Sequence, residues 1–81
     1  MELKDTISLM LSDDYKDRFK AEYYQTKIRY NKIHKMIVKH EAGKLDFELD
    51  DPITLLKDQA SNMGRYLYTL EIRALIEGID L

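Results

Sequence analysis

The chain has 81 residues, a formal net charge of −2 and no cysteine. A chain of this length forms one domain at most, and the lack of thiols excludes disulfides and thiolate metal sites. No apolar run approaches the roughly 20 residues that a membrane-spanning helix needs, and the N-terminal stretch is too charged for a signal peptide. We therefore expect one small domain, residues 1–81, in a reducing cytoplasm and away from membranes.

The first predicted element is a short amphipathic helix over residues 3–11, whose apolar side would carry Leu3, Ile7, Met10 and Leu11. A long helix over residues 13–41 should follow, with Ser12 as its N-cap. Asp13 and Asp14 would then lie in its first turn, where the helix dipole favours negative charge.

An unbroken heptad seam runs along this long helix. Its members follow one another at steps of four and three: Phe19, Tyr23, Thr26, Tyr30, Ile33, Ile37 and His40. The spacing predicts a face that packs against another helix, although few of the seven are aliphatic. Between Tyr15 and His40 eight lysines and arginines meet two acidic residues, a net +6 that leaves −8 on the remainder. A basic helix on an acidic protein indicates a small anionic ligand, or pairing with an acidic helix of a partner subunit.

A linker over residues 42–51 comes next, with Gly43 suited to end the helix. Its Leu45, Phe47 and Leu49 alternate, and they either pack over the hairpin tip or form a short extended segment. A second long helix is predicted over residues 52–77, with Asp51 as N-cap, Pro52 in its first turn and Gly78 at its end. Its apolar stripe again follows steps of four and three: Leu56, Ala60, Met63, Leu67, Leu70 and Ala74.

These elements predict an all-α fold in which a short N-terminal helix precedes an antiparallel hairpin of two long helices. The seam should bury Ile33 and Ile37 opposite Leu56 and Ala60. Each long helix also carries apolar residues outside its seam: Tyr24, Ile28 and Met36 on the first, Leu55, Tyr66 and Ile76 on the second. A partner protomer is the obvious cover, so we expect a homo-oligomer that assembles through helix faces.

Catalytic and metal chemistry find no support in the sequence. The adjacent aspartates, Asp13-Asp14 and Asp50-Asp51, are explained by their places at helix starts. No phosphate-binding glycine loop or nucleophile motif is present, and His34 and His40 do not share a helix face. We expect a protein that is not an enzyme and that uses no catalytic residue, no metal and no cofactor.

A binding patch is better supported. Four neighbouring residues on the first long helix combine aromatic rings with cations: Lys20, Tyr23, Tyr24 and Lys27. Aromatic rings can stack on bases, and cations can bind phosphates. In the alternative interpretation the tyrosines pack at an interface and their hydroxyl groups stay hydrated. On the second helix Gly64 indicates a close approach by another helix or a ligand. A second patch follows it, formed by Arg65, Tyr66, Tyr68 and Arg73, of which Arg65, Tyr66 and Arg73 are the candidate ligand-binding residues. The antiparallel arrangement can bring the two patches together within or between protomers.

The second helix has the pattern Leu55-Leu56-x-x-Gln59-Ala60-x-x-Met63-x-x-Tyr66-Leu67-x-x-Leu70-x-x-Arg73, and the helix before it has the core Ile28-Arg29-Tyr30-x-Lys32-Ile33. Over residues 15–79 the chain thereby resembles small helical-hairpin proteins of gut and crAss-like phages, related to anti-CBASS and anti-Thoeris sponge proteins. The resemblance implies a non-enzymatic oligomer, often a hexamer, in the cytoplasm of an infected bacterial host. It further implies the sequestration of a cyclic di- or trinucleotide or a cyclic ADP-ribose-type signal.

The ligand-binding residues implied by the resemblance are Tyr23, Tyr24, Lys27, Tyr66 and Arg73, supported by Lys20 and Arg65. Two other functions stay open. One is a hairpin oligomer that binds a protein partner and no small molecule, which the second apolar rows favour. The other is a nucleic-acid binder that uses the basic helix. Long nucleic acid is the less favoured partner, because no DNA-binding motif is present and the remainder of the chain is acidic.

Overall fold

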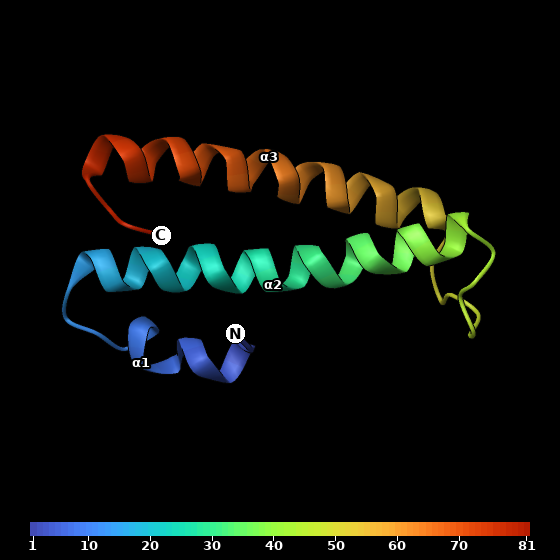
Figure 1. Ribbon diagram of the computed structural model, residues 1–81, viewed down its shortest axis with the longest axis horizontal. Helices are drawn as coiled ribbons and strands as arrows, with labels where there is room; N and C mark the ends of the chain where they lie inside the picture. The colour runs from blue at the N-terminus through green and yellow to red at the C-terminus, as the bar shows by residue number, and fades with distance from the viewer.

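The computed structural model describes all 81 residues and contains helices only. A 3₁₀ helix η1 (Leu3–Thr6) continues into α1 (Ile7–Met10), and the long helices α2 (Tyr15–Glu41) and α3 (Ile53–Glu77) follow. Figure 1 shows α3 lying antiparallel along one side of α2, with η1 and α1 along the other side. The predicted all-α fold, a short N-terminal helix followed by a hairpin, is therefore confirmed. None of the helices combines the length and the apolar character needed to cross a bilayer.

Helix α2 begins differently from the prediction. Asp14, with an extended backbone, is its N-cap, and its side chain accepts a hydrogen bond from the Lys16 backbone N–H. The Ser12 hydroxyl instead donates to Asp17 at 2.8 Å and accepts from the Asp14 backbone N–H at 3.1 Å. Serine and aspartate are both good N-cap residues. Asp14 takes this position because the Ser12 hydroxyl is engaged within the turn that leads into the helix.

The two helix ends at the linker follow from backbone geometry. Gly43 adopts φ +69°, and the N–H groups of Gly43 and Lys44 donate to the carbonyls of His40 and Lys39, so a Schellman motif ends α2. The predicted Asp51 cap is wrong: Pro52 is the N-cap of α3, with an extended ψ of 139° and no side-chain cap. Leu45 and Leu49 are half-buried in the linker, and no strand forms there.

The best-packed part of the molecule lies at the open end of the hairpin, far from the linker. Phe19 of α2 meets Leu70 and Ala74 of α3, and Ile79 joins them. Gly78, at φ +70°, turns the chain after α3 so that Ile79 returns to this core with 5% of its surface exposed. Figure 1 shows the C-terminal segment folding back between the two long helices.

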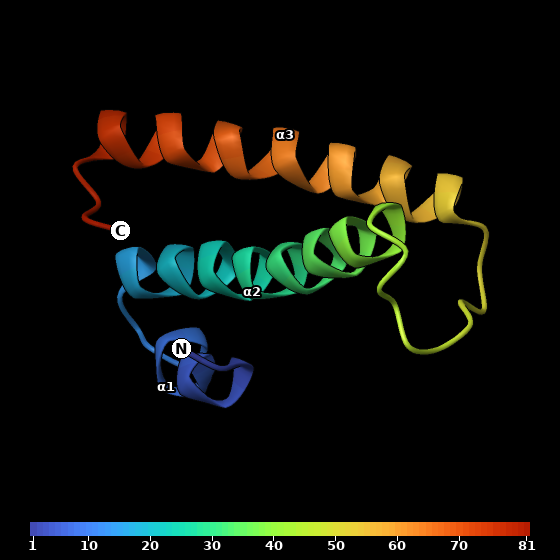
Figure 2. The same ribbon diagram turned by 45° about the vertical axis from the view of Figure 1, so that its right-hand side comes forward.

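The N-terminal segment packs on the opposite side of α2 from α3 (Figure 2). Thr6 is fully buried, and its hydroxyl donates to the Leu3 carbonyl at 2.7 Å and accepts from the Gln25 amide at 2.9 Å. Ala21, one helical turn before Gln25 on the same side of α2, is 2% exposed. Ile28, from the second apolar row of α2, is half-buried and borders a hollow together with Met1 and Leu3, so the segment covers part of that row, a role that we had assigned to a partner protomer.

The predicted apolar side of the first helix is wrong. Ile7, Met10 and Leu11 are 50%, 47% and 73% exposed. Of the four predicted residues only Leu3 is half-buried, and its neighbours on the packed side are Thr6, which is fully buried, and Leu9, which is half-buried. The reason is that residues 3–6 form a tighter 3₁₀ turn, in which side chains three apart lie above one another.

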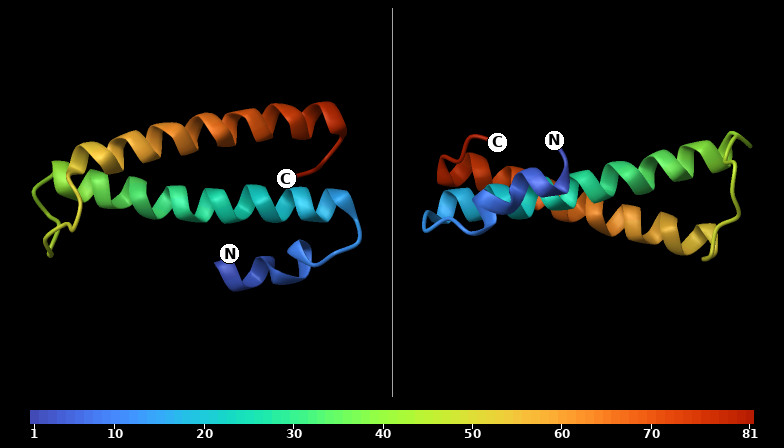
Figure 3. Two further views of the ribbon diagram at one scale, coloured as in Figure 1. Left: turned by 180° about the vertical axis from the view of Figure 1, so that it is seen from behind. Right: turned by 90° about the horizontal axis from the view of Figure 1, so that it is seen from below.

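Toward the linker the seam is less well covered. Ile33 and Ile37 are only half-buried, as are Leu56 and Ala60. The prediction that Ile33 and Ile37 are buried between the two helices is therefore wrong for a single chain. The right-hand view of Figure 3 shows why, because α2 and α3 cross rather than lie side by side along their whole length. Only seven of the 81 residues are buried, which leaves much apolar surface for further contacts.

The close approach predicted at Gly64 is made by a side chain. A Cβ built on Gly64 would lie 3.6 Å from Cε1 of Tyr30, which is ordinary van der Waals contact, and its backbone is helical. Gly64→Ala should therefore stabilise the chain by about 0.5–1 kcal/mol, because alanine is the better helix former and meets no clash. Urea denaturation measures the change, with Ser61→Ala as the control for helix propensity alone. A loss of stability would show that something other than Tyr30 occupies the space over Gly64.

Candidate ligand-binding surface

The four patch residues of α2 lie together on the structure. Tyr23 and Tyr24 meet edge to face, with ring centroids 5.5 Å apart and an interplanar angle of 73°. Lys20, Tyr24 and Lys27 are half-buried, and none of them takes part in a side-chain hydrogen bond or ion pair. This surface, formed by Lys20, Tyr23, Tyr24 and Lys27 and called the α2 patch below, therefore offers one aromatic group and two unpaired cations.

Tyr23 connects the α2 patch to the hairpin. Its ring packs against the core of Phe19, Leu70, Ala74 and Ile79, and its hydroxyl donates to Glu71 of α3 at 2.7 Å. Burial, together with this hydrogen bond and the charge of Glu71, raises the pKa of Tyr23 from 10.0 to about 12. Tyr23 thus holds the two long helices together, and Tyr24 is the tyrosine of the pair that is free of hydrogen bonds.

Beyond Lys27 the aromatic character continues through Tyr30, which we had placed only in the packing seam, and His34, to which we had assigned no role. The Lys27 ammonium lies 5.7 Å from the centroid of the Tyr30 ring. Tyr30 in turn stacks on His34, with centroids 5.9 Å apart and an interplanar angle of 12°. Their spacing of four residues on a helix was the sequence signal for this stack. Lys27 is therefore next to two aromatic surfaces, Tyr24 and the Tyr30–His34 pair, since residues three and four apart on a helix are neighbours.

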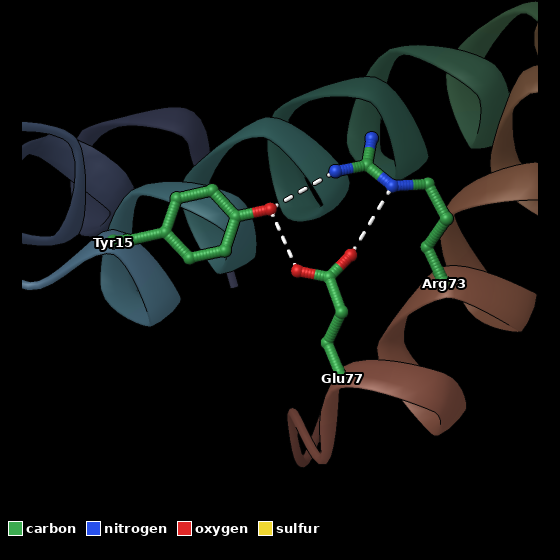
Figure 4. Close-up of polar contacts among 3 residues, drawn as sticks. All are labelled: Tyr15, Arg73 and Glu77. Atoms are coloured by element: carbon green, nitrogen blue, oxygen red, sulfur yellow. Dashed lines mark hydrogen bonds and ion pairs between the residues drawn. The ribbon is translucent and has the colours of Figure 1, made fainter.

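Arg73 lies in a different environment, at the open end of the hairpin. Figure 4 shows its guanidinium between two other side chains: it donates to the Tyr15 hydroxyl at 2.9 Å and to Glu77 at 3.3 Å. The Tyr15 hydroxyl donates to Glu77 at 2.8 Å, and this bond leads the contributions that raise the pKa of Tyr15. The guanidinium carbon also lies 5.1 Å from the centroid of the Phe19 ring. Arg73 therefore serves the packing of the hairpin in a single chain.

Arg65 and Tyr66 are both exposed on α3, Tyr66 by 40%. Neither side chain takes part in a hydrogen bond, ion pair or aromatic contact with α2. The middles of the two helices do meet, at Gly64 and Tyr30, as the hairpin register requires. The two predicted patches are nevertheless not joined by any of these contacts within one chain.

The α2 patch lies outside the concave parts of the surface. Five hollows exist, and none of them is lined by Lys20, Tyr24 or Lys27. One of about 320 Å³ reaches Tyr23 from the side of α3 and the C-terminal segment. The largest, about 450 Å³, lies at the hairpin tip. No three His, Asp or Glu side chains converge to hold a metal ion. Since ligand sites are concave, the α2 patch needs a second wall to enclose a small molecule.

A family model named Sequestin matches residues 13–76, from the turn before α2 to the last turn of α3. The chain belongs to the Sequestin family. The family name denotes sequestration, a binding role rather than a catalytic one. It agrees with the resemblance to sponge proteins drawn from the sequence. The matched region contains both long helices and the linker, and it leaves out η1, α1 and Ile79. No curated protein and no solved structure matches the chain.

The raised pKa of Tyr23 predicts a dependence of stability on pH. The folded chain keeps the phenol neutral to about pH 12, whereas the unfolded chain ionises it at the ordinary pKa of 10.0. The stability from this group is therefore complete below pH 10 and is lost as the pH rises through about 12. In Tyr23→Phe this part of the alkaline decline should disappear, as chemical denaturation at a series of pH values would measure. Tyr68→Phe is the control, and an unchanged decline in Tyr23→Phe would contradict the assignment.

Proposed function

We propose that this chain binds a cyclic nucleotide signal of bacterial immunity and withholds it, unaltered, from the effector that it would activate. The protein would act for a phage, in the cytoplasm of the infected host. Membership of the Sequestin family carries the proposal, because the match covers α2 and therefore the whole α2 patch. The ligand class is a cyclic di- or trinucleotide or a cyclic ADP-ribose-type molecule.

The chemistry of the α2 patch suits such a ligand. A cyclic nucleotide has flat bases and closely spaced phosphates, so it needs aromatic faces and cations within one small area. Tyr24 offers a half-exposed ring, with Lys20 and Lys27 one helical turn before and after it. Stacking of one base contributes about 1–3 kcal/mol, and a hydrogen bond to a charged group about 1.5–3 kcal/mol. In this proposal Tyr23 and Arg73 support the surface from within the hairpin.

The second wall of the site would come from a neighbouring protomer, which can bring Arg65 and Tyr66 of its α3 against the α2 patch. Both residues are exposed and free to make such a contact. Helix α3 also has an apolar face that a single chain leaves uncovered, formed by Tyr68, Ile72, Leu75 and Ile76, with exposed fractions of 66%, 41%, 84% and 78%. Their spacing of four, three and one residues forms one stripe of a helix, called the α3 stripe below. We propose a homo-oligomer, such as a hexamer, assembled through this stripe.

Binding to the α2 patch is testable by calorimetry with cyclic dinucleotides, cyclic trinucleotides and cyclic ADP-ribose isomers. One of them should bind more tightly than about 100 µM, a free energy of roughly −5.5 kcal/mol. Tyr24→Ala or Lys27→Ala should each weaken binding by about 1–3 kcal/mol. Chromatography of the denatured complex should return the ligand unchanged.

Two controls make this test specific. Tyr24→Phe keeps the ring and should keep most of the affinity, and Lys44→Ala removes an exposed lysine of the linker. Failure of every cyclic nucleotide to bind the wild-type chain would reject sequestration of this class. The α3 stripe would then favour the alternative function, binding of a protein partner.

Assembly has its own test in light scattering. The wild-type chain should have a mass of several protomers at micromolar concentration, and Leu75→Glu should lower it, because a charge in an apolar interface is not solvated. Leu75 is 84% exposed in the single chain, so this substitution should leave the hairpin folded. Val38→Glu changes an exposed apolar residue of α2 outside the stripe and is the matched control. A wild-type mass of one chain would contradict the proposed oligomer.

A further inference from the structure

A second cationic surface lies at the other end of α2, near the linker. Three lysines at steps of three and four residues, Lys32, Lys35 and Lys39, line one side of a hollow of about 290 Å³. The linker provides the opposite side with Leu45, Asp46 and Phe47, and Met36 contributes from α2. This hollow, called the tip cleft below, shares no residue with the α2 patch.

The three lysines have no partner within the chain. Lys4 and Lys57 form ion pairs, with Glu2 and Glu41, whereas Lys32, Lys35 and Lys39 form none. No acidic residue stands three or four positions from any of the three on α2. Like charges at this spacing destabilise a helix, and the single carboxylate in the tip cleft, that of Asp46, leaves a positive excess. The cluster therefore disfavours the isolated fold and favours an anion at this place.

Phe47 is the second observation, independent of the charges. It lies between two leucines that are half-buried, yet 54% of its own surface is exposed. Its ring lines the tip cleft and also the larger hollow of about 450 Å³, whose walls include His40 and Leu49. An exposed aromatic ring at the edge of a cationic cleft offers a flat apolar face to a ligand that the lysines hold.

We infer that the tip cleft binds a phosphorylated ligand with a flat ring, such as a nucleoside diphosphate, with its phosphates on the lysines and its ring against Phe47. The tip cleft is slightly smaller than the roughly 300–1,000 Å³ of typical small-molecule sites, and the adjoining hollow adds room for the ring. Lys32, the tip-cleft lysine nearest the α2 patch, lies five residues from Lys27, about 7.5 Å along α2 and about 140° around the helix axis. The tip cleft is therefore on another side of α2, and the inference goes beyond the sequestration proposed for the α2 patch.

The surroundings favour a small ligand over a nucleic-acid strand. Acidic residues follow the tip cleft along the linker: Asp46, Glu48, Asp50 and Asp51. A long phosphate backbone leaving the lysines in this direction would pass these carboxylates, whereas a nucleoside diphosphate ends at the aromatic ring. On the side of the linker, the lysines of the tip cleft are therefore followed by negative charge.

Calorimetric titration of the wild-type chain with ADP, pyrophosphate and adenosine separates the contact of the phosphates with the lysines from the contact of the ring with Phe47. ADP should bind most tightly, pyrophosphate several-fold more weakly, and adenosine most weakly. Lys35→Ala and Lys39→Ala should each weaken ADP binding about tenfold. Phe47→Ala should abolish the advantage of ADP over pyrophosphate, and Phe47→Tyr should keep it.

All of these residues are exposed, so circular dichroism should find the variants folded. Lys44→Ala is the control for a nearby lysine outside the tip cleft, and Tyr24→Ala is the control for the α2 patch; both should bind ADP like the wild type. Equal binding of ADP and pyrophosphate, or full affinity in the lysine variants, would overturn the inference. So would loss of ADP binding in Tyr24→Ala, or a single-stranded oligonucleotide that binds more tightly than ADP with a steeper salt dependence.

Discussion

Packing around Leu70 at the open end of the hairpin supports the rest of the structure. Leu70 has no exposed surface, and it joins Phe19 from the start of α2 to Ala74 and Ile79 from the end of the chain. The bonds of Tyr15 and Tyr23 to glutamates of α3 lie on the edges of this core. Because the core fixes the first turns of α2 against α3, it also fixes the direction in which the basic residues of α2 point.

Helix α2 has neighbours on two opposite sides, and this division decides which of its surfaces are free. Its seam meets α3, and Gln25 meets the N-terminal segment. Lys20, Tyr24 and Lys27 are left with neither neighbour as a side-chain bonding partner. The lysines of the tip cleft follow farther along α2, and the first of them, Lys32, borders a hollow that the N-terminal segment also lines. A helix with a single partner would leave a broad apolar surface, and the N-terminal segment reduces that surface without covering the cations.

The sequence predicted the fold because the signals for it were local and periodic. The heptad steps identified the seam, and Gly43 and Gly78 lie at the helix ends in the left-handed conformation that favours glycine. Which of two suitable residues caps a helix was less predictable. Ser12 and Asp14 are both good N-cap residues, and only the path of the turn before α2 places Asp14 in that position. The apolar side predicted for residues 3–11 was wrong because residues 3–6 form a 3₁₀ helix, which has about three residues per turn rather than 3.6.

The candidate site was less accessible to sequence reasoning than the fold. The grouping of Lys20, Tyr23, Tyr24 and Lys27 follows from helix geometry alone. The environment of Arg73 depends on residues 58 positions away, which no local pattern reveals. Phe47 was visible as an alternating linker residue, but its exposure depends on how the linker turns against α2. Long-range contacts and irregular segments thus set the limit of what could be predicted.

The separation between the tight end of the hairpin and its turn has a consequence for how the chain folds. The buried contacts across the hairpin join residues such as Phe19 and Ile79, 60 positions apart, whereas the seam near the linker is only half-buried. A hairpin that closed from its turn would gain little at first, so the folding barrier should include the closure of a long loop. The same asymmetry makes the tip the easiest part to open once the chain is folded, since separation of the helices near the linker leaves the Leu70 core intact. The hairpin is therefore anchored at the end opposite to its covalent connection, and its tip can adjust without loss of the fold.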